Sequence, residues 1–219
     1  MIKLTIDGRQ IEAKDGKTVL EAALDAGIYV PNLCYHPDLR PVGVCRLCIV
    51  EIEGMKGLPT ACTTTVKEGM VVHTNTQKIQ ELRRNIIWLI LSEHPADLSE
   101  SSQLKKVVEW IGVKDLLPGY IPRPKEVPVI SEQPLFIRDP ARCVLCERCV
   151  NICQEVRGVG AIGLINRGID TIVSPGWDLS MEDAACKFCG ACVEVCPSGA
   201  LIDKEKFSEE EREKILLPC

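Results

Sequence analysis

The sequence predicts an α+β protein built from separate modules, and three features of the chain support this prediction. The first residues alternate apolar and polar side chains around an Asp-Gly pair, and an apolar pattern with helical spacing follows. Five prolines then fall within seventeen residues. Two runs of four cysteines come last, each spaced C-x2-C-x2-C-x3-C. We therefore expect modules at 1–75, 76–135 and 136–205, followed by a charged tail at 206–219.

The first module combines strand patterns with one helical pattern. The pair Asp7-Gly8 predicts a hairpin turn. Thr18 and Glu21 have capping-box spacing at the start of the helical pattern, and Gly27 is a stop signal. A hairpin packed on one helix is typical of the β-grasp fold. The strands are expected at 2–6, 10–12, 47–53 and 70–74, and the helix at 18–26.

Four cysteines of this module have the spacing C-x10-C-x2-C-x13-C. The central x2 pair is that of plant-type [2Fe–2S] ferredoxins, although the first gap is longer than their x4. Gly43, just before this pair, favours a loop that curls around sulfide and donates N–H groups to it. A structural zinc on four thiolates is the alternative. We predict one [2Fe–2S] cluster on Cys34, Cys45, Cys48 and Cys62.

The connector at 76–135 is expected to be helical and then proline-rich. A helix over 76–93 follows from apolar spacing, with Thr74 and Gln77 as its capping box and with Trp88 in the core. Its buried face is expected to hold Ile79, Leu82, Ile86 and Leu89 or Ile90. A second helix is expected over 102–111. The prolines from Pro118 to Pro134 predict an extended linker.

The two cysteine runs predict a bacterial-type 2[4Fe–4S] ferredoxin domain. In two-cluster ferredoxins the fourth cysteine of each run ligates the cluster of the other run. Pro197 follows the last cysteine as in the bacterial signature, whereas Gln154 takes this position in the first run. Zinc and disulfides are the alternatives, and neither needs eight cysteines in this repeat. We predict one cluster on Cys143, Cys146, Cys149 and Cys196, and a second on Cys153, Cys186, Cys189 and Cys192.

The residues outside these motifs limit the function classes. The net charge of −5 and the absence of a basic stripe argue against nucleic-acid binding. No apolar run approaches the roughly 18 to 20 residues of a membrane span. Thirteen cysteines with no leader sequence predict a cytoplasmic protein with reduced thiols. A hairpin is expected over 161–173, a charged helix in the tail, and Cys219 as a spare thiol.

The motifs together resemble the N-terminal iron–sulfur region shared by three groups of proteins. These are the large electron-input subunit of respiratory complex I, the diaphorase small subunit of NAD-reducing hydrogenases and the multi-cluster [FeFe]-hydrogenases. The resemblance is carried by the x10-x2-x13 cysteines, by His94-Pro95 and by the sequences at 153–161, 166–168 and 186–200.

The resemblance implies a non-catalytic electron-transfer subunit of an NAD(P)-linked, possibly electron-bifurcating, complex. Such a subunit conducts single electrons between a flavoprotein and another redox centre or ferredoxin. FMN or FAD and NAD(P) are then expected only on partner subunits of a hetero-oligomer, which would include a further small iron–sulfur subunit. The alternatives are the iron–sulfur subunit of a fumarate-reductase-like enzyme and a free polyferredoxin carrier.

The chain departs from the resembling family after His94. There, three cysteines follow the histidine and hold a further [4Fe–4S] cluster with it, but here no cysteine occurs between His94 and Cys143. We expect a degenerate form of this one-histidine, three-cysteine site, with the apolar helix at 102–111 in its place. His94 would keep a structural position at a helix C-terminus, where the dipole favours its charged form. The chain also ends at Cys219, so we expect an electron carrier without a hydrogenase or molybdopterin domain.

Overall fold

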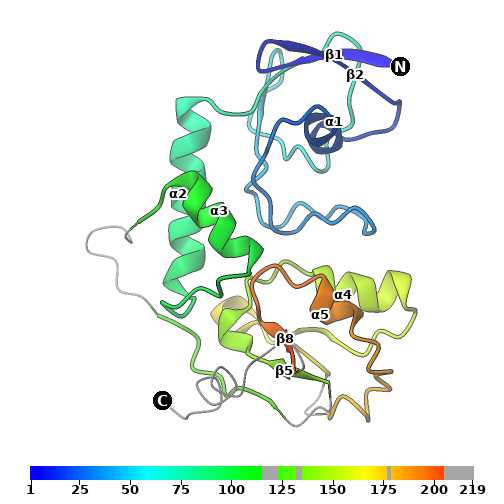
Figure 1. Cartoon of the computed structure of the whole chain (residues 1–219), viewed down its shortest axis with the longest axis vertical. Coiled ribbons are helices and arrows are strands. Elements are labelled where there is room, and N and C mark those ends of the chain that lie inside the picture. Colours follow the sequence, from blue (N-terminus) through cyan, green and yellow to red (C-terminus); the bar gives the residue numbers. More distant parts are fainter. Residues whose placement is uncertain (115–122, 132–134, 177–178, 205–219) are drawn as a thin grey trace. The chain divides into compact units, whose positions relative to one another are not determined.

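A computed structural model describes residues 1–114, 123–131, 135–176 and 179–204, which fall into two units (Figure 1). The first unit contains 1–35, 41–89 and 107–114, and the second contains 36–40, 90–106 and the described residues from 123 onward. Much of the predicted proline-rich linker, the predicted tail helix and Cys219 lie outside the described residues. None of the described helices is long and apolar enough to cross a membrane.

The first unit is built on a four-stranded sheet with strand order β2-β1-β4-β3. The predicted hairpin is confirmed as β1 (Ile2–Ile6) and β2 (Arg9–Ala13), which pair antiparallel. Asp7 and Gly8 both have positive φ, 48° and 78°, as a tight two-residue hairpin turn requires. The other two strands are shorter than predicted: β3 is Glu51–Ile52, and β4 is Val71–His73, which runs parallel to β1.

Helix α1 (Val19–Asp25) begins at the predicted capping box. The backbone N–H of Glu21 donates to Thr18 Oγ1 over 3.2 Å, and Glu21 Oε2 accepts from the Thr18 N–H over 2.7 Å. Its apolar residues are buried in one core with residues of the sheet. Because Cys48 and Cys62 belong to this same core, the packing of α1 on the sheet also fixes the cysteine loops.

Helix α2 (Gln77–Ser92) is one residue shorter at each end than predicted, and its predicted face is buried only in part. Ile79 is fully buried as predicted, whereas Leu82 and Ile86 are partly buried. Of the two alternatives Leu89 and Ile90, Leu89 is 60% exposed and Ile90 is partly buried. The buried row is Ile79, Arg83 and Ile87, which repeat every four residues. The predicted capping box is also wrong, because the Thr74 hydroxyl donates to Asp7 and the Thr76 hydroxyl accepts from the N–H of Ile79 instead.

Helix α3 (Gln103–Ile111) matches the second helix predicted in the connector. Ser102 caps it, since the backbone N–H of Lys105 donates to Ser102 Oγ over 3.1 Å. Leu104, Val107 and Val108 are buried, as their spacing predicted.

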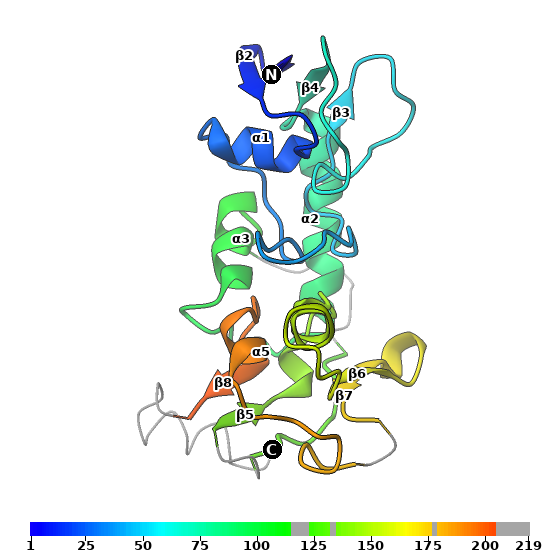
Figure 2. The same cartoon turned by 90° about the vertical axis from the view of Figure 1, so that its right-hand side faces the viewer.

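The second unit contains two small antiparallel sheets and short helical turns. Strand β5 (Phe136–Arg138) pairs with β8 (Leu201–Asp203). The predicted hairpin is confirmed as β6 (Gly163–Ile165) and β7 (Ile172–Ser174), labelled in Figure 2. Helices α4 (Arg148–Asn151) and α5 (Ala191–Glu194) each hold the third cysteine of a run. The remaining turns are 3-10 helices at Pro140–Arg142 and Gly168–Asp170 and a π-helical turn at Ile152–Val156.

Candidate metal centres

The first unit gathers Cys34, Cys45, Cys48 and Cys62 at one place. Three of the four are buried, and Cys45 is partly exposed. Hydrogen bonds from the side chains of Cys45 and Cys62 lower the pKa of Cys34, and a hydrogen bond from Cys62 lowers the pKa of Cys48. These contacts join all four thiols in one group, so four thiolates of one chain are available to a single cofactor.

The loop before Cys45 has the backbone geometry that a sulfur site needs. Gly43 has a φ of 70°, and a Cβ there would lie 3.2 Å from the side chains of Thr60 and Thr63. Arg46, between the second and third cysteines, also has a positive φ of 58°. The backbone N–H of Leu33 donates to Cys45 Sγ over 3.4 Å. Amides aimed at sulfur stabilise thiolate and sulfide charge, so this loop fits an iron–sulfur cluster.

Arg83 of α2 lies against the residues on either side of Cys48 and was not predicted as a site residue. Its Nε donates to the carbonyl of Leu47 over 2.8 Å, and its Nη2 donates to the carbonyl of Ile49 over 3.0 Å. The Trp110 ring centre lies 5.9 Å from its guanidinium carbon. Burial lowers the pKa of Arg83 to about 10, so the side chain still carries its charge near neutral pH.

The second unit brings its cysteines together around two cavities. One cavity is lined by the first three cysteines of the first run and by Cys196, the last cysteine of the second run. The other is lined by the first three cysteines of the second run and by Cys153, the last of the first run. Cys192 reaches both cavities. In each cavity, three cysteines of one run therefore meet the fourth cysteine of the other run.

Both runs repeat the same left-handed backbone positions. The second residue after the first cysteine has a φ of 51° at Leu145 and 48° at Phe188. The first residue after the second cysteine has a φ of 65° at Glu147 and 73° at Gly190. The N–H of Phe188 donates to Cys186 Sγ over 3.4 Å. In the first run, the backbone N–H groups of Leu145 and Arg148 likewise bond Cys143 and Cys146, so each run forms the same loop with amides turned toward its sulfurs.

Burial and the surrounding amides act in opposite directions on these thiols. Burial raises the pKa of the Cys146 thiol, whereas the backbone N–H of Arg148 lowers it. Burial also raises the pKa of Cys192 to about 12. A buried thiolate needs a cation, and an all-sulfur donor set suits iron better than hard cations.

Among the residues that the structure describes, no group of three or more Cys, His, Asp or Glu side chains is arranged to hold a single metal ion.

A second arginine is buried beside the first cavity. Arg148 lies between the second and third cysteines of its run and is 5% exposed. Its Nη1 donates to Gln103 Oε1 over 2.9 Å and to the carbonyl of Val195 over 3.4 Å. Because Val195 directly precedes Cys196, this side chain links the first run to the cysteine that the second run contributes.

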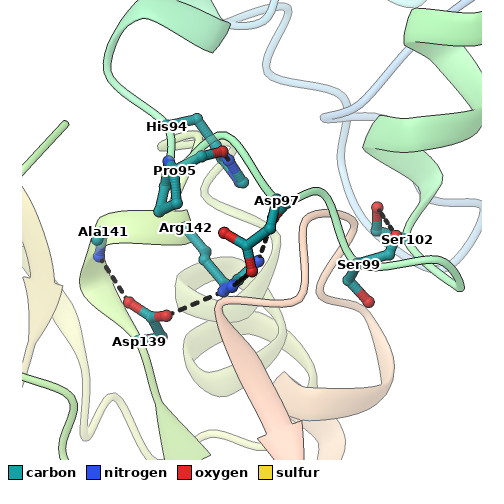
Figure 3. Close-up of polar contacts among 8 residues, drawn as sticks. All are labelled: His94, Pro95, Asp97, Ser99, Ser102, Asp139, Ala141 and Arg142. Carbon is teal, nitrogen blue, oxygen red and sulfur yellow. Dashed lines mark hydrogen bonds and ion pairs between the residues drawn. The ribbon is translucent and has the colours of Figure 1, made fainter. Parts of the chain in front are cut away.

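His94 occupies a buried position after α2 (Figure 3). The prediction that its charged form is favoured there is wrong. Nδ1 lies 2.8 Å from the carbonyl of Pro95, so Nδ1 must be the protonated nitrogen that donates. Nε2 is buried and has no hydrogen-bond partner among the described residues. Burial lowers the pKa of His94, because desolvation outweighs the favourable effects of Pro95 and the nearby carboxylates.

The segment after His94 is attached by one arginine rather than by cysteines (Figure 3). Arg142 Nη1 donates to the backbone carbonyl of Asp97 over 2.6 Å, and its Nη2 pairs with the Asp97 carboxylate. Arg142 Nε donates to Asp139 Oδ2 over 3.0 Å. Asp139 also accepts from the backbone N–H of Ala141 over 3.1 Å.

Comparisons with known proteins match both parts of the chain. Residues 1–77 match the "2Fe-2S iron-sulfur cluster binding domain" family, and residues 133–202 match the ferredoxin-like domain of NADH-quinone oxidoreductase subunit 3. The chain is 41% identical to an NADH-quinone oxidoreductase subunit of Rhizobium meliloti, an alignment that covers 92% of this chain and 24% of the relative.

Two further relatives and one solved structure agree with these matches. The NADP-reducing hydrogenase subunit HndD of Solidesulfovibrio fructosivorans is 34% identical over 95% of this chain and 37% of its own length. The NADPH-Fe(3+) oxidoreductase subunit alpha of Geobacter sulfurreducens is 37% identical over 93% of this chain and 24% of its own length. A crystal structure of an NAD+-reducing [NiFe]-hydrogenase has a TM-score of 0.77 and 28% identity, with 95% of this chain and 89% of that chain covered.

These matches define the class of protein: the chain is an iron–sulfur protein with a [2Fe–2S] domain and a ferredoxin-like domain. The resemblance drawn from its motifs is confirmed. The chain is related to the iron–sulfur region shared by an NADH-quinone oxidoreductase subunit, an NADP-reducing hydrogenase subunit and an NAD+-reducing hydrogenase. It spans between 24% and 37% of the length of the three relatives named above.

Proposed function

We propose that the chain conducts single electrons between a flavin- and NAD(P)-binding partner and another redox centre or ferredoxin, without catalysing a reaction itself. The observation that carries this proposal is the gathering of twelve cysteines into three groups of four, each with backbone amides turned toward sulfur. When bound there, iron–sulfur clusters would supply one-electron steps.

The first part of this proposal concerns the cofactors. A β-grasp domain at 1–75 would hold one [2Fe–2S] cluster on Cys34, Cys45, Cys48 and Cys62. A 2[4Fe–4S] ferredoxin domain at 136–205 would hold two cubane clusters with exchanged fourth ligands. The lining of the two cavities supports this exchange, because each contains three cysteines of one run and the last cysteine of the other. The segment 76–135 would hold no cluster of its own.

The second part concerns the partner. The names of the three relatives and of the solved structure each include NADH, NADP, NADPH or NAD+, and three of the four name a subunit of a larger enzyme. A flavin takes up two electrons from a nicotinamide as hydride and must release them singly to iron–sulfur centres. We infer a hetero-oligomer in which a partner subunit holds the flavin and the nicotinamide, with a further small iron–sulfur subunit beside it.

Anaerobic purification of the tagged chain from its host tests this proposal. We expect a flavoprotein to co-purify, and NADH or NADPH to produce the electron paramagnetic resonance (EPR) signals of reduced [2Fe–2S] and [4Fe–4S] centres only in its presence. A chain that elutes alone at its own mass of 24.2 kDa, fully loaded with iron, would instead indicate a free carrier. The variant Cys45→Ser is the matched control, because it should lose the [2Fe–2S] signal and keep the cubane signals.

A further inference from the structure

We propose that Arg83 is the buried counter-charge of the [2Fe–2S] centre and raises the reduction potential of that centre. This inference rests on the proposed function, because it takes Cys34, Cys45, Cys48 and Cys62 to hold the cluster. Arg83 comes from α2, outside the cysteine loops, and is 1% exposed. A charge buried so completely needs an opposite charge nearby, since desolvation of a lone guanidinium is costly.

The guanidinium is fixed in place by the two residues on either side of one cluster ligand. Its Nε and Nη2 donate over 2.8 and 3.0 Å to the carbonyls of Leu47 and Ile49, and Cys48 lies between these residues. Cys48 is fully buried, with 0% of its surface exposed. The charge is therefore held at a constant place beside the backbone of Cys48, where water screens it little because both residues are buried.

The groups that the structure shows hydrogen-bonded to Arg83 or stacked on it are uncharged. It donates to two carbonyls and lies over the ring of Trp110 at 5.9 Å. Within the described ranges, no carboxylate forms an ion pair with Arg83. Its two hydrogen bonds go to the residues on either side of Cys48, so the thiolates of the cluster site are the counter-charge that we assign to it.

The sign of the effect follows from the charge of the cofactor. Two ferric ions and two sulfides held by four thiolates carry a net charge of two minus, and one electron accepted from a one-electron donor makes it three minus. A fixed cation stabilises the more negative form more strongly. Arg83 therefore favours the reduced state of the centre, and its removal should lower the reduction potential.

An EPR-monitored redox titration of the full chain tests this. At a fixed ambient potential, Arg83→Gln should raise the ratio of oxidised to reduced [2Fe–2S] centre by about tenfold or more, equal to about 59 mV for a one-electron couple. Arg83→Lys keeps the charge and should stay within about threefold of the wild-type ratio. The cubane signals serve as internal controls and should titrate unchanged.

A second pair of variants leaves Arg83 in place. Trp110 is 45% exposed, so the first unit should tolerate its replacement. Trp110→Glu would bring a carboxylate to the guanidinium and offset its charge, while both hydrogen bonds to Leu47 and Ile49 remain. We expect a lower potential for Trp110→Glu than for the uncharged control Trp110→Gln.

The possible failures are distinct. The inference is overturned if Arg83→Gln leaves the potential unchanged or, where that variant does not fold, if Trp110→Glu and Trp110→Gln titrate alike. A wild-type chain without any [2Fe–2S] signal would refute the proposed cluster site itself.

Discussion

Arg142 attaches the segment after His94 through the contacts drawn in Figure 3. These contacts set the size of the effect that we expect when Arg142 is replaced. Arg142→Gln removes the hydrogen bond to the carbonyl of Asp97, the ion pair with the Asp97 carboxylate and the hydrogen bond to Asp139. The segment then keeps its covalent connections but loses its charged anchor. We expect it to open locally more often than in the wild type.

The three contacts of Arg142 contribute unequally to the free energy of local opening. The Asp97 side chain is 75% exposed, so its ion pair contributes about 0 to 1 kcal/mol. The hydrogen bond to the Asp97 carbonyl has a charged donor and contributes about 1.5 to 3 kcal/mol. Asp139 and Arg142 both lie outside the segment, so the hydrogen bond between them does not break when the segment opens. The free energy of local opening should therefore fall by about 1.5 to 4 kcal/mol, equal to a rise of about 10- to 700-fold in exchange rate.

Hydrogen–deuterium exchange on the anaerobic, iron-loaded protein measures this opening without requiring reversible unfolding. The reporter is the amide of Ser102, which donates to the carbonyl of Ser99 over 3.0 Å. Asp97→Asn is the matched control and should raise the exchange rate less than about fivefold, because it loses only the exposed ion pair. The amide of Thr5, in β1, should exchange at the same rate in all variants. The reasoning is refuted if Arg142→Gln exchanges like the wild type, or if Asp97→Asn has the larger effect.

Three further predictions concern the clusters and His94. Cys153→Ser should alter the EPR signal of the same centre as Cys186→Ser, and a change in the Cys143 centre instead would contradict the exchange of ligands. Iron analysis of the reconstituted chain should give about ten atoms per chain, unchanged by His94→Ala, and about fourteen would mean that a further cluster is present. Because the folded pKa of His94 is lowered, the unfolded chain binds a proton first as the pH falls below about 6.5, and stability is lost there. Urea unfolding should thus show that the free energy of unfolding falls less between about pH 7.5 and about pH 5.5 in His94→Asn than in the wild type, by up to about 1.4 kcal/mol per pH unit. Equal falls in both proteins would show that His94 does not cause the pH dependence.

The features that the sequence predicted best are those with a strict local pattern. The hairpin at Asp7-Gly8 and the capping box of Thr18 and Glu21 depend only on neighbouring residues, and the structure contains both. Strand lengths were overestimated around β3 because the same residues also form a loop that holds Cys48. Pairing along a strand depends on distant partners, which a periodicity of two does not specify.

The polar residues around the candidate centres could not be predicted in the same way. The charged state of His94 was predicted from its place after a helix, but burial, which depends on the tertiary fold, decides it. Asp97 and Arg142 are 45 residues apart in sequence, and no motif connects them. Only folding of the second unit brings these two side chains together.

Arg83 was missed although its position carried a signal. It lies four residues after Ile79 and four before Ile87, so the apolar row of α2 runs through it. The predicted row did not include the arginine, in keeping with the rule that charged side chains are rarely buried. That rule assumes that nothing in the interior carries the opposite charge. The proposed four-thiolate site would break this assumption. An arginine inside an apolar helical row that bonds the residues on either side of a cysteine is therefore a candidate member of such a site.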